Sequence, residues 1–499
     1  MTTSQAGICS ADELIKVIVS ELSREILRHC LTHWLLLPEK SSPLSLDELV
    51  EIPYPAQLPD ELPLITVAVC TKDRTILLAD CLKALQEIDY PKLDVLIVDN
   101  APTDDSARVL VESFPEFRYV CEPVIGLDTA RNRAIQEARG EIVAFTDDDA
   151  MPGREWVQAI AEAFAEDSSI MAVTGLVAPA ELQTEPQWIF EKSDGFGRGF
   201  AKRWISARYK RHVALSHGGS GKFGTGANMA FRRCLFEEIG YFDPKLDVGT
   251  PATGGGDLDM FFRVIKTGYT LVYEPRAIVF HRHRRKYKQL ALQYESWGIA
   301  STAHMLKNAI AYKDERAAFL VQWLGTLINR HVRRFFVSIN KSSPLRTGLV
   351  LKELHGSFKG ITRYPIRGIE RGVDRRQKSE KIFRVFQAQT KAVDEKHPKL
   401  VQKGDGVYFI DVNDPLSPLP GADKFPYIDL VISFEGKALG KQRIKNGYTS
   451  VSKERLAEQL ASTLCYTLLQ RVTKEYRDSS PLTIKKDLIE SFASPHIRP

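Results

Sequence analysis

The sequence predicts an α/β protein built on a doubly wound sheet. Nearly continuous apolar runs within 64–70, 93–100 and 141–149 are typical of short strands buried on both faces of a parallel sheet. Stretches of about ten residues with helical character lie between these runs. Strands that alternate with helices in this way indicate βαβ units, and ligands of such sheets bind beyond the carboxyl ends of the strands.

Length and composition place the chain among globular proteins of several domains. It has 499 residues, of which 43% are hydrophobic and 26% charged. The longest strongly apolar stretches, such as 317–328, run about a dozen residues, whereas a bilayer span needs about twenty. The N-terminus lacks the pattern of a secretory signal, and seven scattered cysteines without a C-x-x-C pair favour a reduced, cytoplasmic protein.

The net charge of +5 conceals a strongly basic stretch. Residues 282–399 hold 26 Lys and Arg against 9 Asp and Glu, so the remainder of the chain is acidic. A basic stretch beside an acidic body fits a protein that meets a polyanion in one place and handles a metal in another. Charge alone does not choose between an anionic membrane, a phosphorylated substrate and a nucleic acid.

The chain divides into parts that differ in periodicity and composition. Residues 10–37 have apolar side chains at helical spacing, and a proline-rich connector follows them. Near the other end, 427–434 and 437–446 predict a β-hairpin. We therefore expect an N-terminal helical extension and linker at 1–62, the α/β domain at 63–300, a basic helical region at 301–405 and a small α+β appendage at 406–499.

The sharpest chemical motif is FTDDDAMP at 145–152. Alternate side chains of an extended chain share a face, so Asp147 and Asp149 are expected to point together and Asp148 away from them. Two carboxylates at the exit of a strand suit a hard divalent cation such as Mg²⁺ or Mn²⁺. An acidic turn that caps the next helix is the alternative interpretation.

Polar residues follow other predicted strands in the same way. Asp73 and Arg74 come after the first strand, and Asp99 and Asn100 end the second, where a carboxylate suits a ribose or nucleobase. GLDTARNRA at 126–134 places arginines at the start of a helix, where they suit a diphosphate. Turns and caps explain each motif singly, but several strand exits aimed at one crevice favour a site.

Two later motifs offer a base and further metal ligands. GGGDLDM at 254–260 couples a glycine turn to the start of a helix. Because two residues in a helix differ by about 200°, Asp257 and Asp259 are not expected to face one site, so one is a candidate general base and the other a brace or cap. HRHRR at 281–285 offers two imidazoles, either of which could be a third metal ligand, unless it is a plain basic loop.

The order of these motifs over roughly 63–300 resembles family 2 of the glycosyltransferases, which have the GT-A fold. The resemblance rests on seven motifs at plausible spacing: CTKDR, VDNAPTDD, GLDTARNRA, FTDDDAMP, FGTGANMAFRR, GGGDLDM and FHRHRR. It implies transfer of a sugar from a nucleotide donor to an acceptor hydroxyl with inversion, dependent on Mn²⁺ or Mg²⁺. It also implies a Rossmann-like mixed sheet.

The resemblance assigns expected roles to individual residues. Asp257 occupies the position of the catalytic base, and Asp147, Asp149 and His281 are the expected metal site, with His283 open as an alternative imidazole. The expected nucleotide-sugar-binding residues are Thr71, Asp73, Arg74, Asp99, Asn100, Arg131, Asp147 and Asp148. The expected residues of the donor-sugar and acceptor pocket are Gly226, Asn228 and Asp259.

The sequence departs from the family pattern at one position. A glutamate commonly precedes the base, whereas Gly256 stands there in this chain, so any bracing role of that glutamate is missing or supplied elsewhere. The Q-x-x-R-W signature of processive synthases is absent from the sequence, which favours transfer of a single sugar over polymerisation.

Two other functions compete with this reading. A nucleotidyltransferase would want a glycine-rich phosphate loop after the first strand, where CTKDRTILL has no glycine. A non-catalytic glycan- or polyanion-binding protein would use the basic stretch, but leaves the acidic crevice unexplained.

The expected partners are a UDP-, GDP- or dTDP-sugar donor and a glycan or lipid-linked acceptor of cell-envelope or extracellular glycan assembly, without nucleic acid. For the basic stretch we favour contact with an anionic membrane at its inner, cytoplasmic face over a solvated helical surface.

Overall fold

The computed structural model describes residues 61–206, 220–339, 345–365, 402–403, 406–412, 414–425, 427–434, 437–446 and 450–462. The chain forms two compact units, one of residues 57–392 and one that combines 1–56 with 393–499. Each unit is described by itself. The predicted N-terminal helix at 10–37 and the part of the basic stretch after residue 365 lie outside the described residues. The predicted domain boundaries at 62, 300 and 405 stay predictions.

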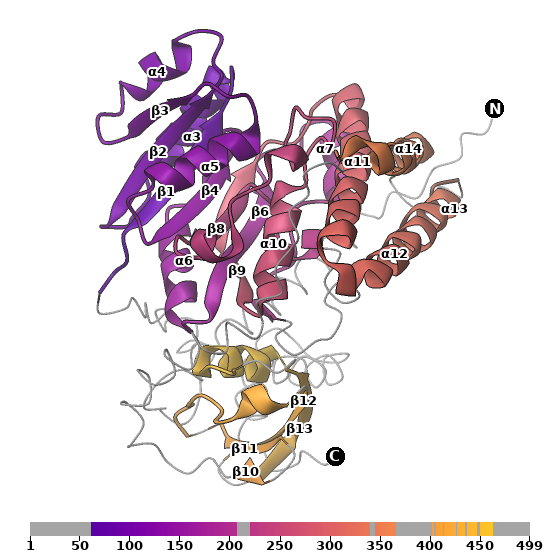
Figure 1. Ribbon diagram of the computed structural model, residues 1–499. Helices are drawn as coiled ribbons and strands as arrows, with labels where there is room; N and C mark the ends of the chain where they lie inside the picture. The colour runs from indigo at the N-terminus through magenta and orange to yellow at the C-terminus, as the bar shows by residue number, and fades with distance from the viewer. Residues whose placement is uncertain are drawn as a thin grey trace, which may run out of the picture. The chain divides into compact units, whose positions relative to one another are not determined.

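The larger unit is organised around a nine-stranded mixed sheet (Figure 1). Its strands run in the order β3-β2-β1-β4-β8-β6-β9-β5, and β7 pairs with β9. The pairs among β1 to β4 that touch are parallel, whereas β8 is antiparallel to both of its neighbours. The strands are β1 (Ile65–Thr71), β2 (Leu93–Asn100), β3 (Arg118–Glu122), β4 (Ile142–Asp147), β5 (Ala150–Pro152), β6 (Ile170–Pro179), β7 (Arg203–Ile205), β8 (Asn228–Arg232) and β9 (Thr270–His281).

Helices cover both faces of this sheet and bury a hydrophobic core on each. One core includes Ala130 of α5 and Phe261 of α10, and the other includes Leu78 of α3 and Trp156 of α6. Buried strands with helices on both sides explain the continuous apolar runs in the sequence. The helices of this part are α3 (Thr75–Gln86), α4 (Ser106–Val111), α5 (Leu127–Glu137), α6 (Trp156–Ala165), α7 (Glu185–Ser193), α9 (Leu235–Ile239) and α10 (Gly256–Thr267).

The helices that come after the sheet in the sequence form a layer that packs beside it (Figure 1). It consists of α11 (Tyr287–Ala311), α12 (Arg316–Gly325), a π-helical segment (Thr326–Val332), α13 (Arg333–Ile339) and α14 (Thr347–Arg363). α11 and α14 touch backbone to backbone, because a Cβ added at Gly298 or at Gly356 would lie 2.1 Å from a carbonyl oxygen of the other helix. Within the described ranges no helix is long and apolar enough to cross a bilayer.

The smaller unit contains a four-stranded sheet and one helix. Its strands are β10 (Gln402–Lys403), β11 (Val407–Asp411), β12 (Tyr427–Phe434) and β13 (Lys437–Lys445). β12 and β13 are antiparallel, which confirms the predicted hairpin, and β11 lies parallel to β12. The described part of the following helix spans 453–462 and begins one residue after Ser452.

Candidate active site

Strand register brings the predicted motifs to one edge of the sheet. Thr71 at the end of β1 is paired with Asp99 of β2, and Cys70 is paired with Asp147 of β4. Because the three strands are parallel, their carboxyl ends deliver these side chains to the same crevice.

Asp147, Asp149 and His281 form a compact cluster. One ligand atom from each lies within 4.8 Å of the others. β5 begins directly after Asp149 and pairs antiparallel with β9, so that Ala150 is opposite His281. His281 Nε2 is 3.2 Å from Asp149 Oδ1. Asp147 and Asp149 therefore lie together, as the sequence predicts, although Asp148 and Asp149 form the turn between β4 and β5 rather than extended chain.

Asp148 points away from this cluster and is held by groups from β1 and the loop after it. Its Oδ2 accepts a hydrogen bond of 2.8 Å from the Thr71 hydroxyl, and Arg74 Nη1 lies 2.6 Å from its Oδ1. Arg74 also binds Asp149, at 2.5 Å. Arg74 thus joins the two carboxylates, while Thr71 and Asp148 bridge β1 to the turn after β4.

The electrostatics of the aspartates differ according to their partners. Burial raises the pKa of Asp148 to about 7 against the opposing charge of Arg74. Burial, followed by the charge of Asp149, also raises the pKa of Asp147. Burial acts on Asp149 as well, but the hydrogen bond and charge of His281 together with Arg74 outweigh it and hold its pKa well below the usual range. Asp149 is therefore the strongest anion of the three.

The cluster fits a divalent cation by its donor set. It offers two carboxylates and one imidazole, which are ligands that Mn²⁺ accepts. The Asp147 side chain is one-third exposed, and its nearest ion-pair partner among the described residues is Arg131, at 4.0 Å. The second imidazole, His283, binds Glu191 at 3.0 Å and packs against Phe190, with ring centroids 4.7 Å apart. The structure thus brings His281, and not His283, to the carboxylates.

The expected nucleotide-binding residues divide into two groups. Asp99 is fully buried and accepts a hydrogen bond from the Tyr119 hydroxyl, yet its Oδ1 has no partner among the described residues. Asp73 has a left-handed backbone, with φ of 53°, and accepts two hydrogen bonds from Thr103. Asn100, in contrast, donates to the carbonyl of Val124 and accepts from the amide of Gly126, so its amide holds a loop in place.

Arg131 lies at the centre of a carboxylate cluster that the sequence reading did not include. Its Nη1 donates to Asp128 Oδ1 at 3.0 Å, and Asp128 is only 2% exposed. Asp247 in turn accepts from the backbone amides of Asp128 and Thr129 at the start of α5. The spacing of Asp128 and Arg131 by three residues in a helix is the signal that could have revealed this pair.

Asp128 explains why residue 256 is glycine. A Cβ at position 256 would lie 1.8 Å from Asp128 Oδ2, so the carboxylate fills the room of a side chain there. That oxygen accepts no hydrogen bond from the described residues. Burial raises the pKa of Asp128 to about 8, Arg131 opposes this, and the charges of Asp247 and Asp257 add to it. A carboxylate from α5 therefore occupies the space beside position 256, where the resemblance leads one to expect a glutamate side chain.

Asp257 is fixed at the start of α10 by two backbone amides. Gly226 N donates to its Oδ2 at 2.9 Å, and Leu258 N donates to its Oδ1 at 2.8 Å. Gly226 has little room for a side chain, because a Cβ there would lie 2.6 Å from Arg131 Nη2. The glycine turn before β8 thus lets Arg131 and Asp257 approach each other.

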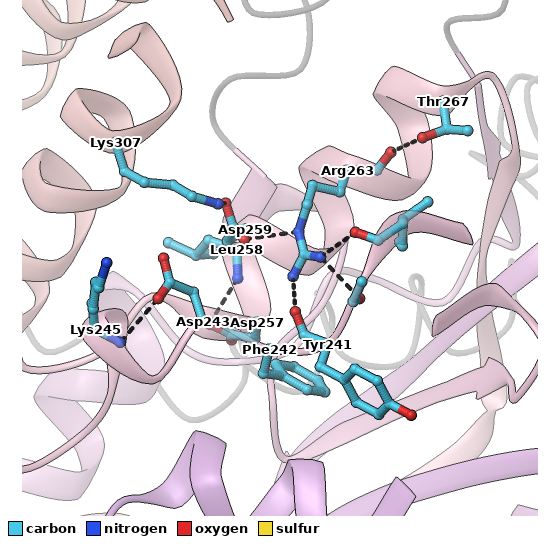
Figure 2. Close-up of polar contacts among 12 residues, drawn as sticks. Tyr241, Phe242, Asp243, Lys245, Asp257, Leu258, Asp259, Arg263, Thr267 and Lys307 are labelled. Carbon is cyan, nitrogen blue, oxygen red and sulfur yellow. Dashed lines mark hydrogen bonds and ion pairs between the residues drawn. The ribbon is translucent and has the colours of Figure 1, made fainter. Parts of the chain in front are cut away.

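Asp259 points into the protein, as the helical rotation of two residues predicts (Figure 2). It is fully buried and forms ion pairs with Lys307 and Arg263, at 2.5 Å and 2.9 Å. Arg263 also donates to the carbonyls of Ile239, Gly240 and Tyr241. Asp259 is thus the brace of α10 rather than a wall of the pocket.

Asn228, the other expected pocket residue, is also buried. Its amide nitrogen donates to the carbonyls of Leu176 and Ala277, and its oxygen accepts from the Trp156 indole. These bonds tie β8 to β6, β9 and α6. Neither Asn228 nor Asp259 is among the described residues that line the cavity.

A cavity of about 1630 Å³ joins the two ends of the site. Its wall includes Asp147, His281, Arg131, Gly226 and Asp257. Other parts of the wall come from the loop 194–198 and from α11, α12 and the π-helical segment. The acidic cluster and the candidate base therefore face one space large enough for a nucleotide sugar.

Comparisons with known proteins identify the family. Residues 66–240 match the model for glycosyl transferase family 2. The succinoglycan biosynthesis protein ExoM of Rhizobium meliloti (strain 1021) is 30% identical over 232 residues, which cover 44% of this chain and 68% of that protein. Glycosyltransferase AglE of Haloferax volcanii is 28% identical over 233 residues, which cover 45% of this chain and 68% of the relative. The chain belongs to glycosyltransferase family 2.

Two solved structures match large parts of the chain, each with a TM-score below 0.5. A mannosyltransferase from Pyrobaculum calidifontis, in complex with GDP-Man and Mn²⁺, matches 70% of this chain and 97% of its own, with 18% identity and a TM-score of 0.41. S. aureus TarS 1-349 matches 64% of this chain and 91% of its own, with 14% identity and a TM-score of 0.37. The mixed sheet, with helices on both faces, is the GT-A fold predicted from the motifs. The protein is a glycosyltransferase.

Proposed function

We propose that this glycosyltransferase moves a single sugar from a nucleotide-sugar donor to an acceptor hydroxyl, with inversion, and that it uses a divalent metal ion. The observation that carries the proposal is the shared cavity. Asp147 and His281 lie in its wall together with Asp257, which comes from a different helix. The candidate metal site and the candidate base therefore line the same cavity.

Asp257 is the proposed general base. Its two oxygens each accept one backbone hydrogen bond, which fixes the direction of the carboxylate. An ionised carboxylate oxygen has a further lone pair, so Asp257 remains able to accept the proton of an attacking hydroxyl. A base on the acceptor side is what direct displacement at the anomeric carbon requires, and inversion follows from a single displacement.

Asp147, Asp149 and His281 are the proposed metal ligands. A bound Mn²⁺ or Mg²⁺ supplies positive charge that stabilises the diphosphate leaving group. Arg131 and Arg284 line the same cavity and add fixed positive charge. The low pKa of Asp149 keeps this carboxylate ionised and ready to bind a cation.

Asp73, Arg74, Asp99 and Thr71 are the proposed nucleotide side of the site. The unpartnered Oδ1 of Asp99 favours this role, because a buried carboxylate oxygen without a partner gains from a ribose or base donor. Asn100 and Asp148 contribute through the loops that they hold.

The acceptor is proposed to be a glycan or lipid-linked glycan of cell-envelope or extracellular polymer assembly, with the enzyme at the inner face of an anionic membrane. The name of the Rhizobium relative, a succinoglycan biosynthesis protein, supports the first part. The basic stretch 282–399 supports the second.

The test is the melting temperature of the full chain with UDP, GDP or dTDP, each with and without Mn²⁺, beside an Asp149→Ala variant. Ligands that bind only the native state raise the melting temperature. We expect one nucleotide to raise it only when Mn²⁺ is present, and the variant to lose that rise. Asp105→Ala, which removes an exposed carboxylate of the same type, is the control and should keep it. No rise with any nucleotide would contradict the proposed donor site.

A further inference from the structure

A row of large apolar side chains lies exposed along the outer side of 316–339. α12, the π-helical segment and α13 follow one another there without a break. The apolar row, as defined here, contains Leu320, Val321, Leu324, Ile328, Val332, Phe336 and Ile339, which are each between 48% and 61% exposed. A soluble surface rarely gathers so many large apolar groups in one place.

The π-helical segment keeps this row straight. Leu324, Ile328, Val332 and Phe336 are spaced by four residues, and in an α-helix such a spacing drifts by about 40° at each step. A π-helix has more residues per turn, so between Thr326 and Val332 the drift is removed. The exposed side chains consequently stay on one face over the whole length of 316–339.

The inner side of the same helix is firmly attached to the catalytic domain. Ala318 and Phe319 are buried in the core beside α10. Arg330 binds Asp194 at 3.0 Å and Glu353 at 2.8 Å, and Arg334 binds the same two carboxylates. The outer face is therefore held in place while it remains exposed.

The exposed charges within 316–339 are positive. The segment has no acidic residue, and of its four arginines Arg330 and Arg334 pair with Asp194 and Glu353, whereas Arg316 and Arg333 are exposed. An apolar face edged by arginines complements the headgroups and outer acyl chains of an anionic lipid surface.

We propose that the outer face of 316–339 is a membrane-docking surface, which lies in the headgroup region of an anionic bilayer with the apolar row toward the acyl chains. The inference rests on the membrane contact proposed above and names the surface that makes it. Val321, at the edge of the row, and Trp323 and Thr326 of the same helical stretch also line the active-site cavity. Docking would thus place the cavity beside the bilayer, within reach of an acceptor that is anchored there.

The experiment is sedimentation of the full chain with vesicles of phosphatidylcholine alone and of phosphatidylcholine mixed with phosphatidylglycerol. The test variant carries Leu324→Gln, Ile328→Gln and Phe336→Gln. The control carries Ile76→Gln, Val109→Gln and Leu182→Gln, which replace three exposed apolar residues elsewhere. A further variant, Arg333→Glu, reverses one charge at the row.

We expect the wild type and the control to bind the mixed vesicles, and the test variant to bind at least about tenfold more weakly, because the apolar contacts supply most of the affinity. Arg333→Glu should reduce the preference for the anionic vesicles. If the test variant bound the mixed vesicles as well as the wild type does, 316–339 would not be the docking surface, and membrane contact would have to come from another part of the protein.

Two other results would also overturn the proposal. A wild type that stays in the supernatant as a dimer, and becomes monomeric with the test variant, would assign the row to a second copy. A wild type that stays in the supernatant, with a test variant of lower melting temperature, would assign it to another segment of the chain, such as 10–37. Sedimentation, oligomeric state and melting temperature do not depend on sugar transfer. Failure of the docking proposal can therefore be distinguished from failure of the proposed function, which the nucleotide-binding experiment tests.

Discussion

Asp257 and Asp128 approach the same cavity from two different helices, and their surroundings predict opposite consequences of substitution. Among the described residues, Asp257 accepts only from two backbone amides, one on each oxygen, and an Asn side chain keeps one of these bonds and loses the other, at a cost of about 1 kcal/mol. The Asp257→Asn variant should therefore keep the fold and the Mn²⁺-dependent nucleotide binding. It should lose about 10²-fold or more in transfer rate, since a general base contributes that much.

The measurement is the rate of transfer with the nucleotide sugar that matches the stabilising nucleotide, alongside the melting temperature with that nucleotide. Asp105→Asn, an exposed aspartate on the turn before α4, is the control and should transfer at the wild-type rate. Near-normal turnover of the Asp257→Asn variant would show that Asp257 is not the general base.

Asp128 should make stability depend on pH. Its pKa rises from 3.8 to about 8 on folding, chiefly because it is buried. A carboxyl that is protonated in the native state stabilises it at low pH and loses that contribution as pH rises toward the folded pKa. The free energy of unfolding of the wild type, relative to Asp128→Asn, should thus fall between pH 4 and pH 8, by up to about 1.4 kcal/mol per unit.

Urea unfolding of both proteins at several pH values measures this difference. The Asn variant retains an oxygen for Arg131, so the comparison isolates the titrating proton. A difference between the two proteins that stays constant over this range would show that Asp128 is ionised throughout.

At the scale of elements, two helical glycines have opposite expected responses to the same substitution. Gly356→Ala in α14 would bring a Cβ to 2.1 Å from the carbonyl oxygen of Glu295 in α11, which forces the two helices apart. We expect a loss of about 1–3 kcal/mol of stability from such overpacking. Gly325→Ala in α12 meets no atom within 4 Å, and should raise stability by about 0.5–1 kcal/mol through helix propensity.

Chemical unfolding of the two variants beside the wild type provides the measurement. A Gly356→Ala variant that is as stable as the wild type would mean that α11 and α14 are less closely packed than the structure indicates.

The strands of the sheet were the elements that the sequence predicted best. The strand expected at 93–100 matches β2 residue for residue, and those at 64–70 and 141–149 differ from β1 and β4 by one or two residues at their ends. Buried parallel strands produce apolar runs that stand out from their surroundings. The π-helical segment left no such signal, because its defining feature is a change in hydrogen bonding and not in side-chain type.

Some residues of the candidate site were predicted from the sequence, and others were missed. The prediction that Asp147 and Asp149 point together and Asp148 away agrees with the structure, although a turn at 148–149, and not an extended chain, produces this arrangement. Asp128 was missed because an aspartate near the start of a helix has an ordinary explanation in the helix dipole. Its proximity to Gly256 arises only when α5 and α10 pack on the same face of the sheet. Contacts between segments that are far apart in the sequence, such as this one, leave no pattern in the residues on either side.

At the scale of the whole molecule, all the described site residues fall within one compact unit, 57–392. We expect a fragment of these residues to fold and to show the same Mn²⁺-dependent rise in melting temperature as the full chain. Differential scanning fluorimetry of the fragment and the full chain with the same nucleotides tests this. Loss of the rise in a folded fragment would mean that 1–56 or 393–499 takes part in donor binding.

The π-helical segment also determines how the length of this chain can vary. Because a π-helical hydrogen bond spans one residue more than an α-helical one, removing one residue between Thr326 and Val332 would let the segment wind as an ordinary α-helix with α13 in nearly the same orientation. An α-helical segment of unchanged length would instead turn α13 by about 100° relative to α12, so that Phe336 and Ile339 would leave the side marked by Leu320 and Leu324. In related chains, the loss of one residue here would thus keep the exposed face in register, whereas the loss of one residue elsewhere in 316–339 would rotate it.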